Sequence, residues 1–392
     1  MANRTAKADY VLFIGLMPVA VVEAKKQNAD VAGKIAQAER YALALDISDT
    51  SDLLPAWQYK NENQTSSPWM NSQGSFAVPF VYSTNGRPYV AQLAEQSGTW
   101  FRDVRHPSFI KKPLQSFHTP QNLLELLTQD NAHASTTLHN EPMSYLRLRD
   151  YQERAISAIE SALSDGRQNI LVAMATGTGK TRTIIGLIYR LLKAERFRRI
   201  LFLVDRTSLG TQATDSMKEM PLEQNLTLSK IYNINELGDM AVHAETRVQV
   251  ATVQAMTRRI FDETDNTLGV GDFDCIIVDE AHRGYTLDTE MTKGEIHARD
   301  ASYYLSSYRR VLDYFDAVKI GLTATPAKHT VDIFGYPVYL YSYTEAVADD
   351  WLIDHEPPIC FTTTLTQNGI HLPKGTLSLS STPTQDIPTP PR

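Results

Sequence analysis

The stretch Asn169–Thr181, with the sequence NILVAMATGTGKT, decides the fold of this 392-residue chain. It begins with an apolar run, Ile170–Ala173, and it ends where a helical pattern, Thr181–Leu192, starts. A glycine-containing loop lies between them. A loop at a strand-to-helix junction presents backbone N–H groups and the N-terminus of a helix to phosphate groups. The stretch therefore predicts an α/β domain that binds a nucleotide.

The residue types in this loop match the needs of a nucleoside triphosphate. Gly177 and Gly179 let the backbone approach the phosphates closely. Lys180 is expected to reach the β- and γ-phosphates, and the Thr181 hydroxyl is expected to ligate Mg²⁺. The strict P-loop pattern has a further glycine where this chain has Met174, so a glycine-rich turn without a ligand is the alternative. The ATP-binding residues predicted in the loop are Ala175, Thr176, Gly177, Thr178, Gly179, Lys180 and Thr181.

Four more short apolar runs follow, separated by segments of helix length. They are Ile200–Val204, Val248–Ala251, Cys275–Val278 and Lys319–Leu322. Strands that are apolar on both faces and joined by helices form buried parallel sheets. Ligands of such sheets gather outside the carboxyl ends of the strands.

Polar residues stand at the ends of the last two runs. Asp279 is expected to hold the Mg²⁺ of ATP, and Glu280 is expected to be catalytic, polarising the attacking water. His282 is expected to couple this site to the next strand end, where Thr323 and Thr325 carry hydroxyls. The alternative for the two acids is a pair of strand-end caps or surface ion pairs.

Gln152 ends the run LRDYQ upstream of the loop. Its amide offers a donor and an acceptor, which suits a residue that reads adenine in ATP, and a polar position on an amphipathic helix is the alternative. The ordered set LRDYQ, ATGTGKT, FLVDR, DEAH and TATP resembles the first RecA-like domain of superfamily-two helicases and translocases, over about residues 145–350. That resemblance implies an ATP-driven motor acting on nucleic acid. Such motors have a second RecA-like domain with a QxxGR-type motif; none follows Pro326, so we expect half a motor with feeble ATP turnover by itself.

A β-hairpin is predicted near the N-terminus. A three-residue loop pairs Ile14 with Pro18. In that register Asp9 lies opposite Glu23, and Lys25 shares the face of Glu23 because side chains two apart on a strand point the same way. One face then carries two carboxylates that could hold Mg²⁺ and a lysine that could orient or activate water. A charged hairpin edge is the alternative.

A helical pattern, Asp30–Leu45, follows and places Gln37 and Tyr41 on one face. The two acids and the lysine resemble the PD-(D/E)xK nuclease core, although the proline that usually precedes the first acid is missing. The glutamine and tyrosine resemble the additional motif of RecB-type nucleases. These resemblances imply a catalytic role for the first three residues and a supporting role for the other two.

The predicted fold class is α/β, with a PD-(D/E)xK-type nuclease domain followed by a RecA-like parallel-sheet P-loop domain. We expect the nuclease domain at residues 1–135, a linker at 136–144 and the motor domain at 145–355. Residues 356–392 are expected to be a remnant with a disordered tail rich in Ser, Thr and Pro. Few residues precede Asp9, so the first helix of the nuclease domain is expected to be short or missing.

Further segments of the nuclease domain carry β-type and basic patterns. Phe76–Tyr82 and Pro88–Leu93 are predicted strands, with Asn85-Gly86 as a hairpin turn signal. One basic cluster follows the P-loop helix, where we favour a role at the helix C-terminus and in solvent over DNA contact. A second could line a DNA-facing edge of the nuclease domain. The clusters are Arg190, Lys193, Arg196, Arg198 and Arg199, and Arg102, Arg105, Lys111 and Lys112.

The order nuclease, linker, motor resembles the restriction subunit of type I restriction-modification enzymes, as do the stretches Phe80–Arg87 and Tyr343–Ala346. The resemblance implies an ATP-dependent endonuclease and translocase that uses ATP and Mg²⁺. It also implies duplex DNA, a methyltransferase subunit and a specificity subunit as partners. Two alternatives stay open: a superfamily-two helicase or repair translocase with a non-catalytic N-terminal domain, and a truncated product that binds ATP without efficient turnover.

The composition excludes several other classes of protein. A content of 42% hydrophobic and 21% charged residues is typical of globular domains, and no apolar run approaches the ~18–20 residues of a membrane span. Two cysteines, Cys275 and Cys360, without metal-type spacing indicate a reducing compartment, so we expect a cytoplasmic protein without a zinc site. A net charge of −7 argues against bulk electrostatic coating of DNA but allows a local basic groove.

Overall fold

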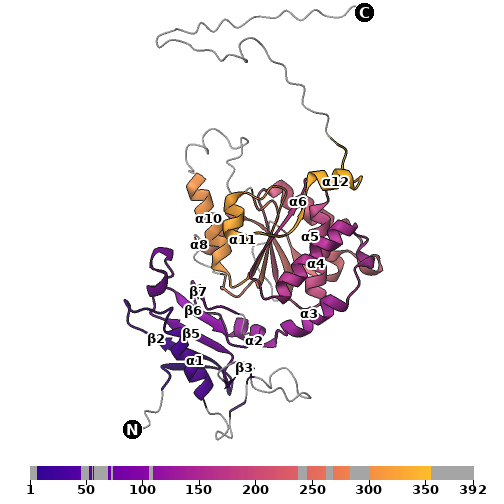
Figure 1. Cartoon of the computed structure of the whole chain (residues 1–392). Coiled ribbons are helices and arrows are strands. Elements are labelled where there is room, and N and C mark those ends of the chain that lie inside the picture. Colours follow the sequence, from indigo (N-terminus) through magenta and orange to yellow (C-terminus); the bar gives the residue numbers. More distant parts are fainter. Residues whose placement is uncertain are drawn as a thin grey trace, which may run out of the picture. The chain divides into compact units, whose positions relative to one another are not determined.

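The computed structural model describes residues 7–45, 53–54, 56, 69–71, 74–105, 109–236, 245–261, 268–282 and 301–354. Up to Leu352 these residues belong to one compact unit. A five-stranded and a seven-stranded sheet organise this unit (Figure 1). Among the helices of these residues, none is long and apolar enough to cross a membrane.

The seven-stranded sheet is parallel at every pairing. Its strands are β8 (Asn169–Met174), β9 (Ile200–Val204), β10 (Asn233–Asn235), β11 (Thr246–Thr252), β12 (Cys275–Val278), β13 (Val318–Thr323) and β14 (Pro337–Tyr341). They lie in the order β10-β11-β9-β12-β13-β8-β14. Every residue of β9 and β12 is buried, which explains their continuous apolar sequences. The predicted α/β fold class is confirmed, and the sheet includes all five predicted strands.

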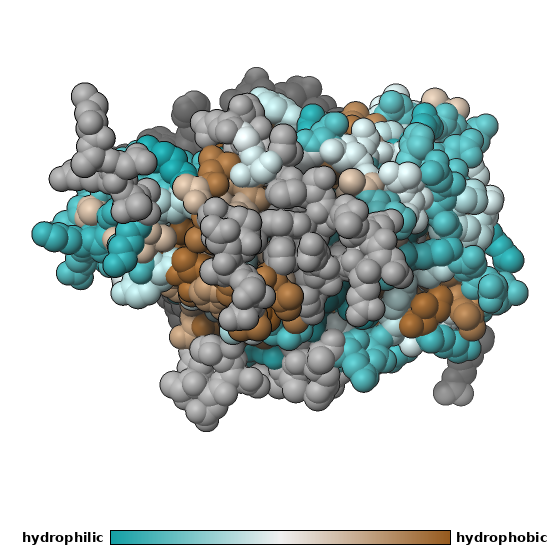
Figure 2. All heavy atoms as spheres, turned by 90° about the horizontal axis from the view of Figure 1, so that it is seen from below, coloured by the Kyte–Doolittle hydropathy of each residue, from teal (hydrophilic) through white to brown (hydrophobic). Residues whose placement is uncertain are grey.

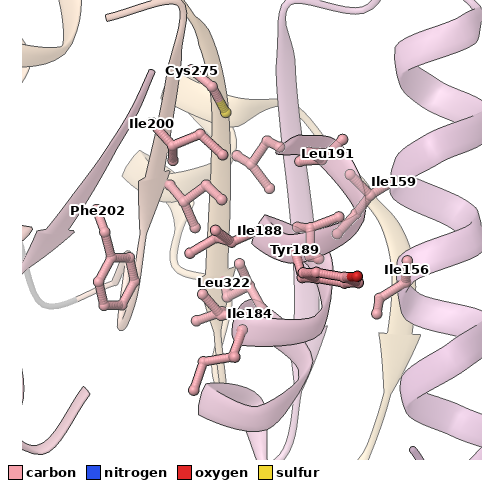
Figure 3. Close-up of a cluster of buried hydrophobic side chains, with 14 of the residues drawn as sticks. Ile156, Ile159, Ile184, Ile188, Tyr189, Leu191, Ile200, Phe202, Cys275 and Leu322 are labelled. Carbon is pink, nitrogen blue, oxygen red and sulfur yellow. The ribbon is translucent and has the colours of Figure 1, made fainter. Parts of the chain in front are cut away.

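Helices cover both faces of this sheet (Figure 1). They are α4 (Asp150–Ser164), α5 (Lys180–Lys193), α6 (Thr207–Glu219), α7 (Leu228–Ile231), α8 (Val253–Phe261), α10 (Ala301–Tyr314), α11 (Lys328–Phe334) and α12 (Tyr343–Ala348). Ile170 and Val172 of β8 belong to the core with α4 and α5, whereas Leu171 belongs to the core with α8 and α10. This alternation follows from the period of a strand. In Figure 3, Ile184 and Ile188 of α5 lie beside the sheet in the first core.

The five-stranded sheet has the order β1-β2-β5-β6-β7. Its strands are β1 (Tyr10–Ile14), β2 (Met17–Ala24), β5 (Phe80–Thr84), β6 (Thr99–Asp103) and β7 (Lys112–Leu114). The β2–β5 pair is parallel and the other pairs are antiparallel. Helix α1 (Ile35–Ala44) packs with Val21 and Val81, and helix α2 (Pro120–Thr128) packs with the other core, around Tyr82. A separate pair, β3 (Trp69–Asn71) and β4 (Gly74–Phe76), is antiparallel.

The N-terminal hairpin differs from the prediction at its turn. Ile14 pairs with Met17 rather than with Pro18, so the turn has two residues instead of three. A register shift after Leu12 adds one residue to β2, as in a β-bulge. Because of this shift, Tyr10 pairs with Val22, which is the register that the sequence predicted for the start of the hairpin.

Three predicted features of the nuclease domain are wrong or displaced. The run Pro88–Leu93 is not a strand; residues Ala91–Gln96 form a 3₁₀ helix, η2, and β5 pairs with β6 instead. The side chain of Asn85 donates to the carbonyls of Gln27 and Gln96, so it joins two loops rather than closing a hairpin. Helix α1 begins at Ile35, later than predicted.

The segment predicted as a linker contains a helix. Helix α3 (Asn131–Asn140) is capped by Asp130, whose side chain accepts from the N–H of His133, and it buries Ala134 and Leu138. Further 3₁₀ turns, η3 (Ser144–Leu146) and η4 (Glu223–Asn225), lie within the following domain. The domain boundaries stay predictions, and the predicted tail at 356–392 lies outside the described residues.

Polar contacts join the two halves of the compact unit. His118 Nε2 lies 2.9 Å from Oδ2 of Asp316, just before β13, and its Nδ1 lies 2.7 Å from the Tyr82 hydroxyl. Gln129 donates to Asp274, just before β12, at 2.7 Å. The loops that enter β12 and β13 therefore contact the segment around α2.

Of the coloured surface in Figure 2, much is hydrophilic, and separate hydrophobic areas lie within it. Large apolar side chains that are exposed include Tyr10, Phe13 and Leu16 of the β1–β2 hairpin. Such residues are common on monomeric proteins, so we assign them no role.

Candidate nucleotide and nuclease sites

The P-loop lies where β8 ends and α5 begins. Gly177 and Gly179 have φ angles of +85° and +78°, in the left-handed region that favours glycine. A Cβ atom on Gly179 would lie 2.7 Å from Nε2 of Gln152, so a larger residue would also collide there. Lys180 is the first residue of α5 and is buried. The loop thus has the backbone form that phosphate binding requires.

The Gln152 side chain forms hydrogen bonds to the backbone of this loop. It is buried on α4, and its Nε2 donates to the carbonyl oxygens of Thr178 at 3.0 Å and Gly179 at 3.3 Å. Its Oε1 accepts from the N–H of Arg149 at 3.0 Å. The Tyr151 hydroxyl donates to the Thr178 carbonyl as well, at 2.9 Å, a contact that the sequence did not predict. The amide that the sequence assigned to adenine is therefore bonded to the loop backbone.

The acids after β12 reach the P-loop. Nζ of Lys180 lies 3.5 Å from Oε1 of Glu280, and Oδ1 of Asp279 accepts from the N–H of Glu280 at 2.9 Å. The φ of Glu280 is +49°, which is unusual for a residue with a side chain. Parallel pairing of neighbouring strands brings these groups to one edge of the sheet. Thr181 and Asp279 are the residues there that could hold Mg²⁺.

The predicted coupling residues lie together. His282 Nδ1 lies 2.8 Å from the Thr323 hydroxyl and 3.3 Å from Oε2 of Glu280. The N–H of Thr325 donates to the Thr323 hydroxyl at 3.2 Å. A chain of polar contacts therefore runs from Glu280, after the end of β12, to the end of β13.

The nuclease candidates meet at the end of β2. Oδ2 of Asp9 accepts from the N–H of Ala24 at 2.8 Å, which places this acid beside the Glu23–Lys25 segment. Lys25 Nζ forms an ion pair with Oε1 of Glu23. Glu23 is 2% exposed, and its Oε2 has no hydrogen-bond partner among the described residues.

A divalent cation fits this arrangement. A buried carboxylate oxygen without a partner is unfavourable, and a bound cation would satisfy it. The described residues contain no group of three or more His, Cys, Asp or Glu side chains suited to a metal, so the two acids would need further oxygen ligands. Asp9 and Glu23 are the residues that would hold the ion.

Gln37 and Tyr41 lie on helix α1, which packs on the face of β2 that carries Val21. Glu23 shares that face, because it follows Val21 by two positions. Nε2 of Gln37 donates to the Tyr41 hydroxyl at 2.7 Å. The structure thus places the predicted supporting pair on the helix that packs on the face of β2 that carries Glu23.

The first basic cluster has partners inside the protein. Arg190 is fully buried and its Nε lies 2.6 Å from Oε1 of Glu160, whose pKa is raised by burial. Lys193 lies 2.6 Å from both Glu141 and Glu223. Our preference for a solvent-facing cluster is therefore wrong for Arg190, because Glu160 on α4 and the carbonyl of Leu138 surround it. It is also wrong for Arg196 and Arg199, which are buried.

The second basic cluster is also engaged. Arg102 pairs with Glu39 at 2.8 Å, and Arg105 pairs with Asp103 at 2.7 Å. The other two members, Lys111 and Lys112, contact the Ala32 carbonyl and the Asp316 carboxylate. These contacts support a structural role.

Two family models match different parts of the chain. A family model described as the type I restriction enzyme EcoKI endonuclease subunit second domain matches residues 1–127. A model described as the type III restriction enzyme res subunit matches residues 145–328. The chain is 46% identical over 376 residues to the type I restriction enzyme EcoKI endonuclease subunit of Escherichia coli (strain K12), covering 94% of this chain and 32% of that protein. The chain belongs to the type I restriction endonuclease subunit family.

Other relatives extend this result. A second family member, the type I restriction enzyme EcoAI endonuclease subunit of Escherichia coli, is 30% identical over 373 residues, covering 91% of this chain and 38% of that protein. The chain thus spans about a third of the length of these curated relatives. A putative ATP-dependent helicase, IRC3 of Saccharomyces cerevisiae, is 29% identical over 225 residues, covering 53% of this chain and 28% of that protein. The predicted family is confirmed, and the roles of the individual site residues stay predictions.

Proposed function

We propose that this chain contributes two catalytic sites to a type I restriction enzyme: an ATPase site that drives movement along duplex DNA, and a nuclease site that cuts it. The observation that carries the proposal is the presence of both constellations on one chain. Lys180 and Glu280 meet at the carboxyl ends of strands of the seven-stranded sheet. Glu23 and Lys25 meet at the carboxyl end of β2 in the five-stranded sheet. Membership of the restriction subunit family supports both assignments.

At the ATPase site, the backbone of the P-loop and Lys180 bind and orient the phosphates. Thr181 and Asp279 would hold Mg²⁺, and Glu280 polarises the water that attacks the terminal phosphorus. His282 contacts both Glu280 and Thr323, so a movement of the Glu280 side chain would alter the position of the end of β13.

At the nuclease site, Asp9 and Glu23 would hold Mg²⁺, and Lys25 orients the water that attacks the DNA phosphorus. That water loses a proton and forms the new P–O bond while the bond to the leaving deoxyribose oxygen breaks. The leaving oxygen takes up a proton, so the products are a phosphate end and a hydroxyl end. In both sites a bound Mg²⁺ supplies stabilisation of the charge that develops on the phosphate oxygens. Gln37 and Tyr41 support the site from α1.

Partners of the whole enzyme belong to the same proposal. Duplex DNA is the substrate, and methyltransferase and specificity subunits complete the complex. A second candidate function is a helicase or repair translocase whose N-terminal domain does not cut DNA. The match of about half of the chain to a putative ATP-dependent helicase favours that alternative.

The variant Asp9→Asn separates the two functions. Asparagine keeps an acceptor for the N–H of Ala24 but removes the charge that holds a cation. In an assembled enzyme that carries this sequence in its full-length subunit, we expect DNA cleavage to fall by about 100-fold or more while ATP hydrolysis persists. The control Glu95→Ala removes an exposed acid of the same domain and should leave both activities intact. Unchanged cleavage by the Asp9→Asn enzyme would contradict the nuclease role of Asp9, whereas ATP hydrolysis without any cleavage by the unsubstituted enzyme would favour the helicase alternative.

A further inference from the structure

Two neighbouring strands each carry a buried side-chain oxygen without a partner. Oε2 of Glu23 and Oγ of Ser83 lack a hydrogen bond to any residue that the structure describes. Glu23 is 2% exposed and Ser83 is 0% exposed. The two residues are register partners in the parallel pair β2–β5, so their side chains leave the same face of the sheet.

Other polar residues of β5 have partners, which makes Ser83 the exception along this strand. The Tyr82 hydroxyl bonds to His118 at 2.7 Å, and the Thr84 hydroxyl lies 3.2 Å from that of Thr99. Burying a hydroxyl without a partner is unfavourable, because the group loses its hydrogen bonds to water.

On the face of the sheet that packs against α1, the paired residues change from apolar to polar near the ends of β2 and β5. Val21 and Val81 are paired and belong to the apolar core with α1. Two residues further along both strands, the next pair on that face is Glu23 and Ser83. A polar pair thus stands at the carboxyl ends of two paired parallel strands, directly after the apolar pair.

The oxygens around Glu23 are partly engaged already. Oε1 of Glu23 forms an ion pair with the Lys25 ammonium, and Oδ2 of Asp9 accepts a hydrogen bond from the N–H of Ala24. Mg²⁺ prefers six oxygen ligands and keeps several of its waters. A cation at this site therefore needs neighbouring groups that hold its water ligands in place.

We propose that Ser83 is a positioning residue of the nuclease site, whose hydroxyl holds a water ligand of the divalent cation bound by Glu23. This inference rests on the proposed nuclease function. Ser83 lies in the stretch Phe80–Arg87, which resembles the restriction family but to which the sequence alone assigned no function.

The test is Mn²⁺ binding to the chain without nucleotide, measured by calorimetry. Ser83→Ala should weaken Mn²⁺ binding by about 10-fold or more, as losses of groups that orient metal ligands do. The same variant should leave the metal-free chain as stable as wild type or more stable, because it removes an unsatisfied buried hydroxyl. A structural role for Ser83 gives the opposite sign, a loss of stability without metal.

Two further variants separate the possible failures. Thr84→Ala removes the adjacent hydroxyl, which points to the opposite face, and should leave Mn²⁺ affinity unchanged. Glu23→Gln should abolish binding. If Glu23→Gln binds Mn²⁺ as wild type does, the proposed nuclease site itself is wrong. If Glu23→Gln loses binding and Ser83→Ala does not, the role of Ser83 alone is wrong.

Discussion

Nζ of Lys180 lies 3.5 Å from Oε1 of Glu280, so the lysine of the P-loop and the acid after β12 already share one edge of the sheet. They belong to separate segments of the chain and meet because β12, β13 and β8 are consecutive neighbours in the parallel sheet. All the predicted phosphate and Mg²⁺ contacts for ATP thus come from a single domain.

The first prediction concerns Lys180. Lys180→Ala should lower the affinity for Mg·ATP by about 10- to 100-fold, because a hydrogen bond to a charged group contributes about 1.5–3 kcal/mol. Titration with a fluorescent ATP analogue measures this loss. Lys230→Ala, at an exposed lysine of α7, is the matched control and should bind as wild type does. Equal binding by the two variants would refute the site.

The second prediction concerns Gln152. Its amide protons go to the carbonyls of Thr178 and Gly179, so Gln152→Ala should loosen the loop that every nucleoside triphosphate uses. We expect the affinities for ATP and GTP to fall by a similar factor, about 3- to 10-fold for one or two lost hydrogen bonds. Competition titrations measure both affinities. A loss confined to ATP would instead assign adenine recognition to this side chain.

The third prediction concerns pH. Burial and the charge of Lys112 lower the pKa of His118 to about 3, so the imidazole is neutral in the folded chain. An unfolded histidine takes up a proton near pH 6.5, and the folded one does not until about pH 3. The free energy of unfolding should therefore fall as pH drops below about 6.5, by about 2 kcal/mol from this residue between pH 7 and pH 5.

Denaturant unfolding at both pH values measures this effect. His118→Gln keeps a donor and an acceptor for Asp316 and Tyr82 but cannot titrate, so it should lose that part of the pH dependence. The control His139→Gln, at an exposed position of α3, should retain the wild-type profile. An unchanged slope in His118→Gln would contradict the prediction.

The fourth prediction concerns the buried pair on α4 and α5. Arg190→Met leaves the Glu160 carboxylate without its cation and should destabilise the chain by about 3–5 kcal/mol. Adding Glu160→Leu should restore most of that loss, as measured by a denaturant-unfolding cycle. The exposed pair Arg309 and Asp313 offers a control, where Arg309→Ala should cost about 1 kcal/mol or less. Additive effects of the two buried substitutions would argue against the pair.

The sequence predicted the five central strands of the seven-stranded sheet because their signals are local, but it did not predict the outer strands β10 and β14. Dense Ile, Val and Leu runs, and glycines at a strand-to-helix turn, identify β8 and its neighbours without knowledge of the partners. The contact of His282 with Thr323 also followed, since neighbouring parallel strands end together. The role of each site residue remains a prediction.

Features that depend on partners distant along the chain could not be predicted from the sequence. The bulge after Leu12 arises from cross-strand pairing, and the partner of Arg190 lies on another helix. Asn85-Gly86 has the composition of a hairpin turn, but β5 pairs with β6 after a longer connection. Ser83 gave no signal by itself, because its distinguishing feature is a missing hydrogen bond in the folded chain.

The central claim is that one chain carries an ATPase site and a separate nuclease site. The most direct measurement follows phosphate release and cleavage of circular DNA in the same reaction, with an assembled enzyme whose full-length subunit carries Glu23→Gln or Lys180→Ala. We predict that Glu23→Gln retains phosphate release and loses cleavage, whereas Lys180→Ala loses both, because cutting depends on ATP-driven movement. Cleavage by the Glu23→Gln enzyme at the wild-type rate, or ATP hydrolysis by the Lys180→Ala enzyme at the wild-type rate, would contradict it.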